Sequence, residues 1–286
     1  MNITIRRAKP EDANSGCGSI CYDAFTTISQ AHNFPPDLPS PEVATDFLEW
    51  MLSHPHFYCV VAQLGDRIVG SNVLDERNAI YGIGPITVDP SVQNKSVGRL
   101  LMDDVMARVA ARGAPGVRLV QAAFHSRSLA LYTKLGFDAR ELLVCMQGAP
   151  LAVKLPGRSV RPATEADIDA CNRVCRAVHG HDRGGELLDA IRQGTATVVE
   201  TDSRITGYAT IIGFFGHTVG ESNVDLQALI GDTKEIAGPG FLLPTRNAQL
   251  FRWCLSHGLR VVQPMTLMSV GLYNDPAGAF LPSITY

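Results

Sequence analysis

Segment 83–102 has the residue types and spacing of an anion-binding turn. An apolar stretch ends at Asp89-Pro90, a polar loop follows, and a helix is predicted by apolar residues at 97, 100, 101, 105 and 109. At such a junction, unpaired backbone N–H groups and the positive end of the helix dipole converge on one point. Gly98 lets an anion approach the backbone closely, and Lys95 and Arg99 add positive charge. The junction therefore suits a phosphate or pyrophosphate.

The residue identities in this segment are more specific than its strand–loop–helix pattern. Val88-Asp89-Pro90, Gln93 and Gly98 have the order and spacing of the pattern Q/R-x-x-G-x-G/A that follows a strand ending in V-x-P. The segment resembles motif A of the GNAT superfamily of acyl-CoA N-acyltransferases. Ser96 stands where the first glycine of that motif is expected.

A second segment, His125–Phe137, reads HSRSLALYTKLGF and follows at the right distance. It resembles the N-x-x-A-x-x-L-Y-x-K-x-G-F signature of the same superfamily. His125 replaces the asparagine and Ser128 replaces the alanine. Two such segments in order are far more specific than either alone.

The resemblance implies that acetyl-CoA is the co-substrate and that the protein is an N-acetyltransferase acting on a primary amine. The loop 93–99 would cradle the pyrophosphate of coenzyme A, and the pantetheine arm would lie beside strand 83–88 as if it were another strand. The coenzyme A contacts implied in this way are Ile86, Thr87, Val88, Gln93, Asn94, Lys95, Ser96, Val97, Gly98, Arg99, Ser128, Leu131 and Tyr132.

The transfer needs a neutral amine, donors for the developing oxyanion and a proton for the departing thiolate. By the resemblance, the Tyr132 hydroxyl lies near the thioester sulfur, and a phenol with a pKa of about 10 is protonated at neutral pH. We therefore expect Tyr132 to be the catalytic acid; simple packing of its helix is the alternative. Asp75, Glu76 and Asp89 flank the strands that should border the site, and none of them is singled out as a base.

The acceptor would enter opposite coenzyme A, where the proline-stiffened loop 30–37 falls. We expect His32, Asn33 and Phe34 to bind the acceptor, and Asp37 offers a further polar group. A rigid surface loop without a role in binding is the alternative.

The elements that must position these residues alternate between strands and helices. The expected strands of the first half are 2–6, 57–64, 67–75, 79–88, 117–124 and 138–147. The expected helices are 10–31, with a break near its end, 41–53, 96–112 and 126–135. This alternation predicts a mixed α/β sheet flanked by helices.

The chain also repeats itself in short pieces. Residues 5–12 (IRRAKPED) resemble 160–167 (VRPATEAD), DRIVG at 66–70 resembles SRITG at 203–207, and LYTKLGF at 131–137 loosely resembles LYNDPAGAF at 272–280. We predict two tandem GNAT-like domains, 1–150 with the acetyl-CoA site and 157–286 as a degenerate copy. The Gly- and Pro-containing stretch 148–158 is the expected linker.

The second half lacks a Gln-x-x-Gly-x-Gly at 241–251, the place that we match to motif A. We expect this copy to pack on the first domain and to shape the acceptor pocket. The final stretch 272–286 is apolar and aromatic, which predicts a docked segment. A further hypothesis is that the carboxylate of Tyr286 reaches the site as a base.

Composition narrows the partners. A net charge of −3 gives no overall attraction to nucleic acid or anionic membranes, and no apolar run approaches the roughly 18 residues of a membrane span. The start of the chain lacks the apolar core of a signal peptide, and the seven cysteines show no metal-binding spacing. We expect a cytoplasmic monomer or homodimer without metal, nucleic-acid or membrane partners, whose acceptor is a small-molecule or protein amine.

Two other classes of protein remain open. A module that senses acyl-CoA without turnover would keep the same binding loop, and the departures at Ser96, His125 and Ser128 are compatible with it. A structural protein that has lost coenzyme A is disfavoured by the loop from Gln93 to Arg99.

Overall fold

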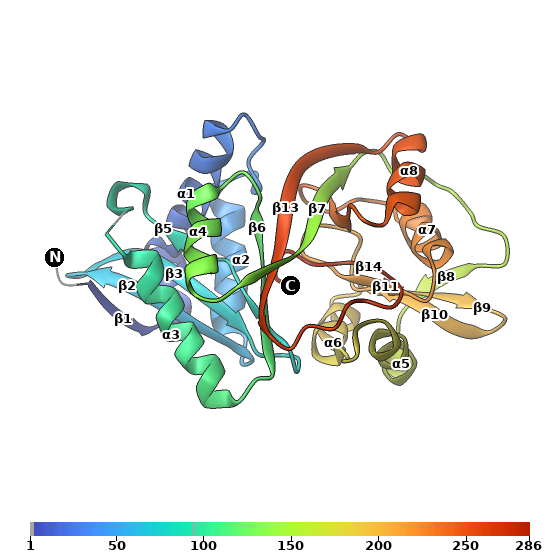
Figure 1. Cartoon of the computed structure of the whole chain (residues 1–286), viewed down its shortest axis with the longest axis horizontal. Coiled ribbons are helices and arrows are strands. Elements are labelled where there is room, and N and C mark those ends of the chain that lie inside the picture. The colour runs from blue at the N-terminus through green and yellow to red at the C-terminus, as the bar shows by residue number, and fades with distance from the viewer. Residues whose placement is uncertain (1–2, 94) are drawn as a thin grey trace.

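The computed structural model describes residues 3–93 and 95–286 (Figure 1). The helices and strands of the first half are β1 (Ile3–Arg7), α1 (Gly18–Ala31), α2 (Pro41–Ser53), β2 (Phe57–Leu64), β3 (Arg67–Asp75), β4 (Tyr81–Ile83), β5 (Thr87–Val88), α3 (Val97–Arg112), β6 (Gly116–Ala122), α4 (Ser126–Lys134) and β7 (Asp138–Gln147). Short helical turns lie at Pro10–Asp12, Ala13–Cys17 and Pro90–Val92.

The second half also alternates between strands and helices. Its elements are β8 (Ser159–Pro162), α5 (Ile168–His179), α6 (Gly184–Arg192), β9 (Thr197–Thr201), β10 (Arg204–Ala209), β11 (Thr218–Gly220), α7 (Asn223–Asp232), β12 (Phe241–Pro244), α8 (Ala248–Ser256), β13 (Arg260–Gly271) and β14 (Ala279–Leu281), with a helical turn at Glu165–Asp167. The mixed α/β architecture expected from the sequence is confirmed.

Two expected elements are divided differently. The strand expected at 79–88 is interrupted at Gly84-Pro85, so that β4 and β5 are separate; Pro85 has no N–H for a ladder, and Gly84 has a φ of 138°. The helical stretch 10–31 is broken near its start, because Gly16 adopts a φ of 141°. The break that we expected near its end is therefore wrong.

Local sequence explains why α2 forms where it does. Ser40 caps the helix by accepting a hydrogen bond from the Val43 N–H at 3.4 Å, and Pro41 occupies the first turn, where no N–H is needed. Its buried face consists of Ala44, Leu48 and Met51, at helical spacing.

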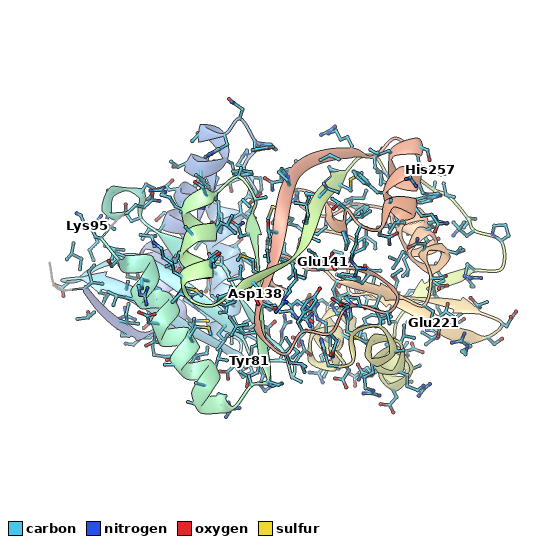
Figure 2. The ribbon with its side chains drawn as sticks, in the orientation of Figure 1. Tyr81, Lys95, Asp138, Glu141, Glu221 and His257 are labelled. Carbon is cyan, nitrogen blue, oxygen red and sulfur yellow. The ribbon has the colours of Figure 1, made fainter. Side chains whose placement is uncertain are left out.

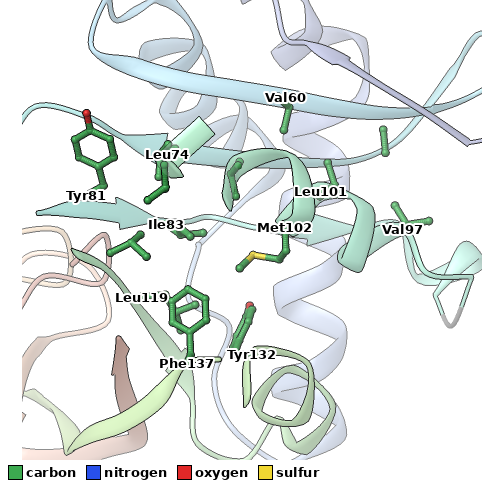
Figure 3. Packing of buried hydrophobic residues seen from close by; sticks show 14 of the residues in the cluster. Val60, Leu74, Tyr81, Ile83, Val97, Leu101, Met102, Leu119, Tyr132 and Phe137 are labelled. Atoms are coloured by element: carbon green, nitrogen blue, oxygen red, sulfur yellow. The ribbon is translucent and has the colours of Figure 1, made fainter. Parts of the chain in front are cut away.

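Helices cover both faces of the first half's sheet. Strand β2 shows this directly, since Cys59 and Val61 belong to the core under α1 and α2, whereas Val60 and Ala62 belong to the core under α3 and α4. This alternation is the pattern of a strand buried on both faces. The core under α3 and α4 is drawn in Figure 3.

The strands form two sheets. One has nine strands, in the order β1-β2-β3-β4-β6-β13-β7-β12 with β5 paired to β3, and the other has the order β14-β11-β10-β9-β8. Strand β13 of the second half lies between β6 and β7 of the first half and is antiparallel to both. Strand β7 in turn lies between β13 and β12. Figure 1 shows β7 and β13 side by side in the middle of the molecule.

The order β6-β13-β7-β12 has approximate twofold symmetry. The strand–helix–strand unit β6-α4-β7 of the first half corresponds to β12-α8-β13 of the second half, and each unit places its last strand between two strands of the other. Neither half therefore holds a complete sheet by itself. Residues 148–158 contain no helix or strand, and the division into 1–150 and 157–286 stays a proposal.

A repeated ion pair confirms the duplication. Arg6 donates two hydrogen bonds to Asp12 at 2.7 and 2.8 Å, and the backbone N–H of Lys9 donates to the same carboxylate at 2.8 Å. At positions 155 residues further on, Arg161 donates to Asp167 at 2.8 and 2.8 Å, and the N–H of Thr164 donates at 2.8 Å. The resemblance between 5–12 and 160–167 thus reflects one structural device used twice.

Two of the expected correspondences are wrong. Residues 131–137 lie at the end of α4, whereas 272–280 run into β14 and contain no helix, so their similar letters do not match in structure. Segment 241–251 is β12 and the start of α8, which correspond to β6 and α4. The structural counterpart of motif A is therefore β11, Ser222 and α7. These short sequence matches gave the wrong structural correspondence because apolar and turn residues recur at many strand ends.

The C-terminal stretch is docked, as expected. Strand β14 pairs with β11 through Phe280 and Val219, and Tyr286 is buried. The Tyr286 hydroxyl contacts His181 Nε2 at 2.9 Å and accepts a hydrogen bond from Arg118. A Cβ at Gly82 would lie 2.1 Å from the carbonyl oxygen of Thr285, so this close approach requires glycine.

We predict that Asp12→Asn and Asp167→Asn each lower the free energy of unfolding at neutral pH by about 1–3 kcal/mol, the range for hydrogen bonds to charged groups. The hydrogen bonds from Arg6 and Arg161 lower the pKa of these carboxyls below their ordinary value. A carboxyl with a lowered folded-state pKa stabilises above its unfolded pKa of about 3.9, and this stabilisation is lost as the pH falls toward the folded-state pKa.

Urea unfolding followed by the fluorescence of Trp50 and Trp253 measures the effect at pH 7 and in acid. The matched controls are Glu11→Gln and Glu165→Gln, since both carboxylates are exposed. Variants that differ from the wild type equally at both pH values would contradict the role of the ionised carboxyl.

Candidate active site

The sheet opens into a wedge between β4–β5 and β6. Strands β4 and β6 run parallel and pair only at Tyr81–Val117 and Gly82–Arg118. Beyond this point β5 pairs with β3 and β6 pairs with β13, each on its far side. The facing edges at 83–88 and 119–122 are therefore unpaired within the described chain, and backbone groups on them are open to an extended ligand.

The N-terminal end of α3 closes one end of the wedge. The N–H of Leu100 is bonded to the carbonyl of Ser96 at 3.0 Å, and the N–H groups of Val97, Gly98 and Arg99 precede it without a partner inside the helix. A Cβ at Gly98 would lie 3.6 Å from Leu131 and 3.7 Å from Val88, so α3, α4 and β5 meet at this point.

Ser96 stands in the left-handed region, with φ 64° and ψ 10°. This conformation favours glycine, which explains why motif A carries a glycine at the matching place. Ser96, which replaces the glycine of motif A, therefore stands at a position where the backbone adopts the left-handed conformation.

The other expected contacts of coenzyme A surround this helix end. Thr87 is buried and shares a hydrogen bond with Ser71 at 3.0 Å, while Ile86 and Val88 are half-buried on the strand edge. Lys95 and Arg99 are exposed, and Arg99 lies 3.5 Å from Asp103. Figure 2 shows Lys95 at the outer edge of the first half. Asn94 lies outside the described residues.

Helix α4 supplies polar groups to the same place. Gln93 accepts a hydrogen bond from Arg127 at 2.7 Å, and Ser128 donates to the side-chain oxygen of Gln121 at 2.8 Å. The amide nitrogen of Gln121 is buried and has no hydrogen-bond partner among residues 3–93 and 95–286. Burial lowers the pKa of His125 to about 4, so this imidazole is neutral at pH 7.

Tyr132 stands on α4 at the inner end of the wedge. Its ring is buried beside Phe137, at 6.1 Å between centroids, and Figure 3 shows its hydroxyl directed away from α4. The hydroxyl makes no hydrogen bond to a described residue. Burial raises the pKa of this phenol, so it is protonated at neutral pH.

Tyr132 lines a partly open cavity to which both halves of the chain contribute side chains. The wedge contributes Ile83, Ile86 and Leu119 to the lining, and the second half contributes two phenylalanines, an isoleucine and a threonine. Those second-half residues are Phe214, Phe215, Ile284 and Thr285.

Loop 30–37 reaches this cavity through Asp37, which the sequence analysis named as a further polar group beside the three expected acceptor residues. The Asp37 carboxylate accepts a hydrogen bond from Gln263 of β13 at 2.7 Å, and burial raises the pKa of the carboxyl above its ordinary value. No sequence signal could have found Gln263, because it lies 226 positions away. Phe34 and His32 instead contact Phe124, at 4.4 and 5.2 Å between ring centroids.

The expected acceptor residues His32, Asn33 and Phe34 do not line the cavity in this structure, although they lie on the same loop. Their role in binding the acceptor stays a prediction. Of the three acids that flank the strands, Asp75 pairs with Arg77, Glu76 with Arg108, and Asp89 with Arg67. These three carboxylates do not line the cavity either.

The seven cysteines are buried free thiols. Across residues 3–93 and 95–286, no three His, Cys, Asp or Glu side chains are grouped as a metal ion requires. Among the helices of these residues, none is long and apolar enough to cross a membrane.

The fold of the chain and the wedge in its first half can be compared with known proteins. Residues 23–137 match the acetyltransferase (GNAT) family. The whole chain has the fold of two tandem GNAT-like domains. No curated protein matches it in sequence.

Solved structures resemble the whole chain. A protein from Pyrococcus horikoshii assigned as an acetyltransferase superposes with a TM-score of 0.74 at 19% identity, over 94% of this chain and 89% of that one. A GCN5-related N-acetyltransferase from Sphaerobacter thermophilus gives 0.61 at 16%, over 96% of both chains. A tandem GNAT protein of the clavulanic acid biosynthesis pathway gives 0.58 at 11%, over 94% and 98%. These likenesses concern the fold.

We predict that Ser96→Gly raises the free energy of unfolding by up to about 1 kcal/mol, because glycine adopts the left-handed conformation without steric cost. Ser91→Gly is the matched control, since Ser91 lies in a helical turn without positive φ and should lose stability instead. Urea unfolding of both variants measures the difference. Equal losses in the two variants would show that position 96 has no such requirement.

Proposed function

We propose that the protein is an N-acetyltransferase that moves the acetyl group of acetyl-CoA onto a primary amine. Three observations carry this proposal: the open N–H groups at the start of α3, the unpaired facing edges of the wedge, and Tyr132 in the cavity. The match of residues 23–137 to the acetyltransferase (GNAT) family supports the same reaction class.

Coenzyme A fits these features in its chemistry. The N–H groups at the start of α3 and the helix dipole suit the pyrophosphate. Two amides of the pantetheine arm would pair with backbone groups of Ile86 and Val88, as an added strand does. The amide nitrogen of Gln121, which is unpartnered within the described chain, offers one more donor beside the arm.

The second half supports a single donor site, because its equivalent place is filled by the chain itself. Strand β14 pairs along the edge of β11 that corresponds to the open edge of β4–β5. The start of α7 is occupied by Asp225, which accepts hydrogen bonds from the backbone of Ser222 at 3.0 Å and from Arg158 at 2.8 Å. A buried carboxylate there would repel a phosphate.

Tyr132 is the group that we assign to the leaving thiolate. Its raised pKa keeps the hydroxyl protonated, and the hydroxyl has no competing partner among the described residues. When the carbon–sulfur bond breaks, the phenol gives its proton to the thiolate as general acid.

We expect calorimetric titration with acetyl-CoA to detect binding to the wild type and a loss of affinity of at least about 100-fold in Gly98→Trp, since the indole would cover the N–H groups that hold the pyrophosphate. The control is Leu100→Trp, which adds the same ring to the same helix at an exposed residue. Undiminished binding to Gly98→Trp would refute the assignment of the pyrophosphate loop.

Tyr132→Phe should lower kcat by about 100-fold or more while the Kd of acetyl-CoA stays unchanged, because only proton transfer is lost. Thiol release is measured with a panel of amines: 2-phenylethylamine, spermidine, an amino acid amide and a lysine peptide. Unchanged turnover in Tyr132→Phe would exclude the hydroxyl as the acid. Tight binding of acetyl-CoA without turnover on any amine would support an acyl-CoA sensor instead.

A further inference from the structure

Building on the proposed function, we propose that the acceptor is a primary amine with an apolar body and no second charge, such as an arylalkylamine. Its ammonium group would pair with Asp37, and its body would lie among the aromatic side chains of the cavity that both halves line.

The composition of the cavity favours such a ligand. Its wall is mainly apolar and includes Phe25, Leu38, Phe47, Phe214, Phe215 and Ile284. Among the described residues that line it, Asp37 is the one carboxylate, and no lysine, arginine or histidine accompanies it. A small number of polar groups in an apolar cavity fixes the orientation of a ligand.

Among the described residues, Asp37 has no cationic partner. Its one hydrogen bond is donated by the neutral amide of Gln263, and the nearby thiols of Cys21 on α1 and Cys145 on β7 are held neutral, because burial raises the pKa of each. A buried carboxylate without a counter-ion is costly, and an ammonium group relieves that cost. An amino acid acceptor would place its own carboxylate in the cavity beside that of Asp37. A polyamine would bury further ammonium groups without partners.

Asp37 is positioned by the second half. Gln263 is buried on β13, and its other amide atom, Oε1, has no partner in the described part of the chain, where the side chain bonds Asp37 alone. Tyr132 lines the same cavity. The anchor for the amine and the acid for the thiolate therefore share one cavity, and the anchor exists only when both halves are assembled.

Asp37 and Tyr132 account for the protons that move during acetyl transfer. The ammonium gives one proton to Asp37, and the neutral nitrogen attacks the thioester carbonyl. The carbon–nitrogen bond forms, the carbon–sulfur bond breaks, and the thiolate takes the proton of Tyr132. The nitrogen then loses a second proton, which restores the Tyr132 hydroxyl. The products are an amide, a thiol and one proton held by Asp37.

The test compares matched acceptors on the full chain. We expect 2-phenylethylamine to be acetylated with a kcat/KM at least about tenfold above that of phenylalanine, which adds only a carboxylate, and that of spermidine. Comparable or better turnover of phenylalanine or spermidine would overturn the proposal. So would a failure to acetylate 2-phenylethylamine while acetyl-CoA still binds, which leaves the donor site standing. Absence of acetyl-CoA binding would instead remove the proposed function and this inference together.

Variants test the anchor. Asp37→Asn should lower kcat/KM for 2-phenylethylamine by about 100-fold while the Kd of acetyl-CoA is kept, and the control Asp46→Asn, on the exposed side of α2, should change neither. Wild-type activity in Asp37→Asn would overturn the proposal.

Gln263→Ala tests the positioning role through pH. Its hydrogen bond lowers the pKa of Asp37 and so opposes the effect of burial. Without it the pKa rises further, and the acidic limb of the kcat/KM profile should move to higher pH. An unmoved limb would show that Asp37 is not the group that titrates.

Discussion

Strands β7 and β13 hold each other in the middle of one sheet, and most other features depend on this antiparallel pairing. Each strand has neighbours from the opposite half on both of its edges, so its backbone N–H and C=O groups are satisfied only when both halves are present. A half on its own would expose the edge of β6 or of β12 along its length. The two copies are thus joined by backbone hydrogen bonds as well as by side chains.

The same pairing shapes the wedge. Because β13 occupies one edge of β6, the opposite edge faces β4–β5 and is left free where the strands diverge beyond Gly82 and Arg118. The path of the C-terminal segment past Gly82 then brings Ile284 and Thr285 into the cavity wall. The second half therefore contributes to the site through its fold, whether or not it binds any ligand of its own.

Two copies of one architecture have been put to different uses. In the first half the N–H groups at the start of α3 are left open, whereas in the second half Asp225 satisfies the start of α7 and β14 covers the edge of β11. Small local changes are enough for this difference: a carboxylate in the first turn of a helix and a terminal strand of three residues. Both copies keep the ion pair, at Arg6–Asp12 and Arg161–Asp167, and only the first keeps the pattern of motif A.

The sequence by itself determined what depends on neighbouring residues. Hydrophobic periodicity and helix-start residues predicted α2, β2, β3 and β7 with their bounds. The residues of motif A located the turn at 93–99. Both were possible because hydrophobic spacing and helix starts depend on neighbouring residues. Only the tertiary structure decided the exchange of β7 and β13, the counterpart of motif A at Ser222, and the meeting of Asp37 with Gln263. Those contacts join residues far apart in the chain. The backbone hydrogen bonds and buried charges that select them produce no periodic pattern in the sequence.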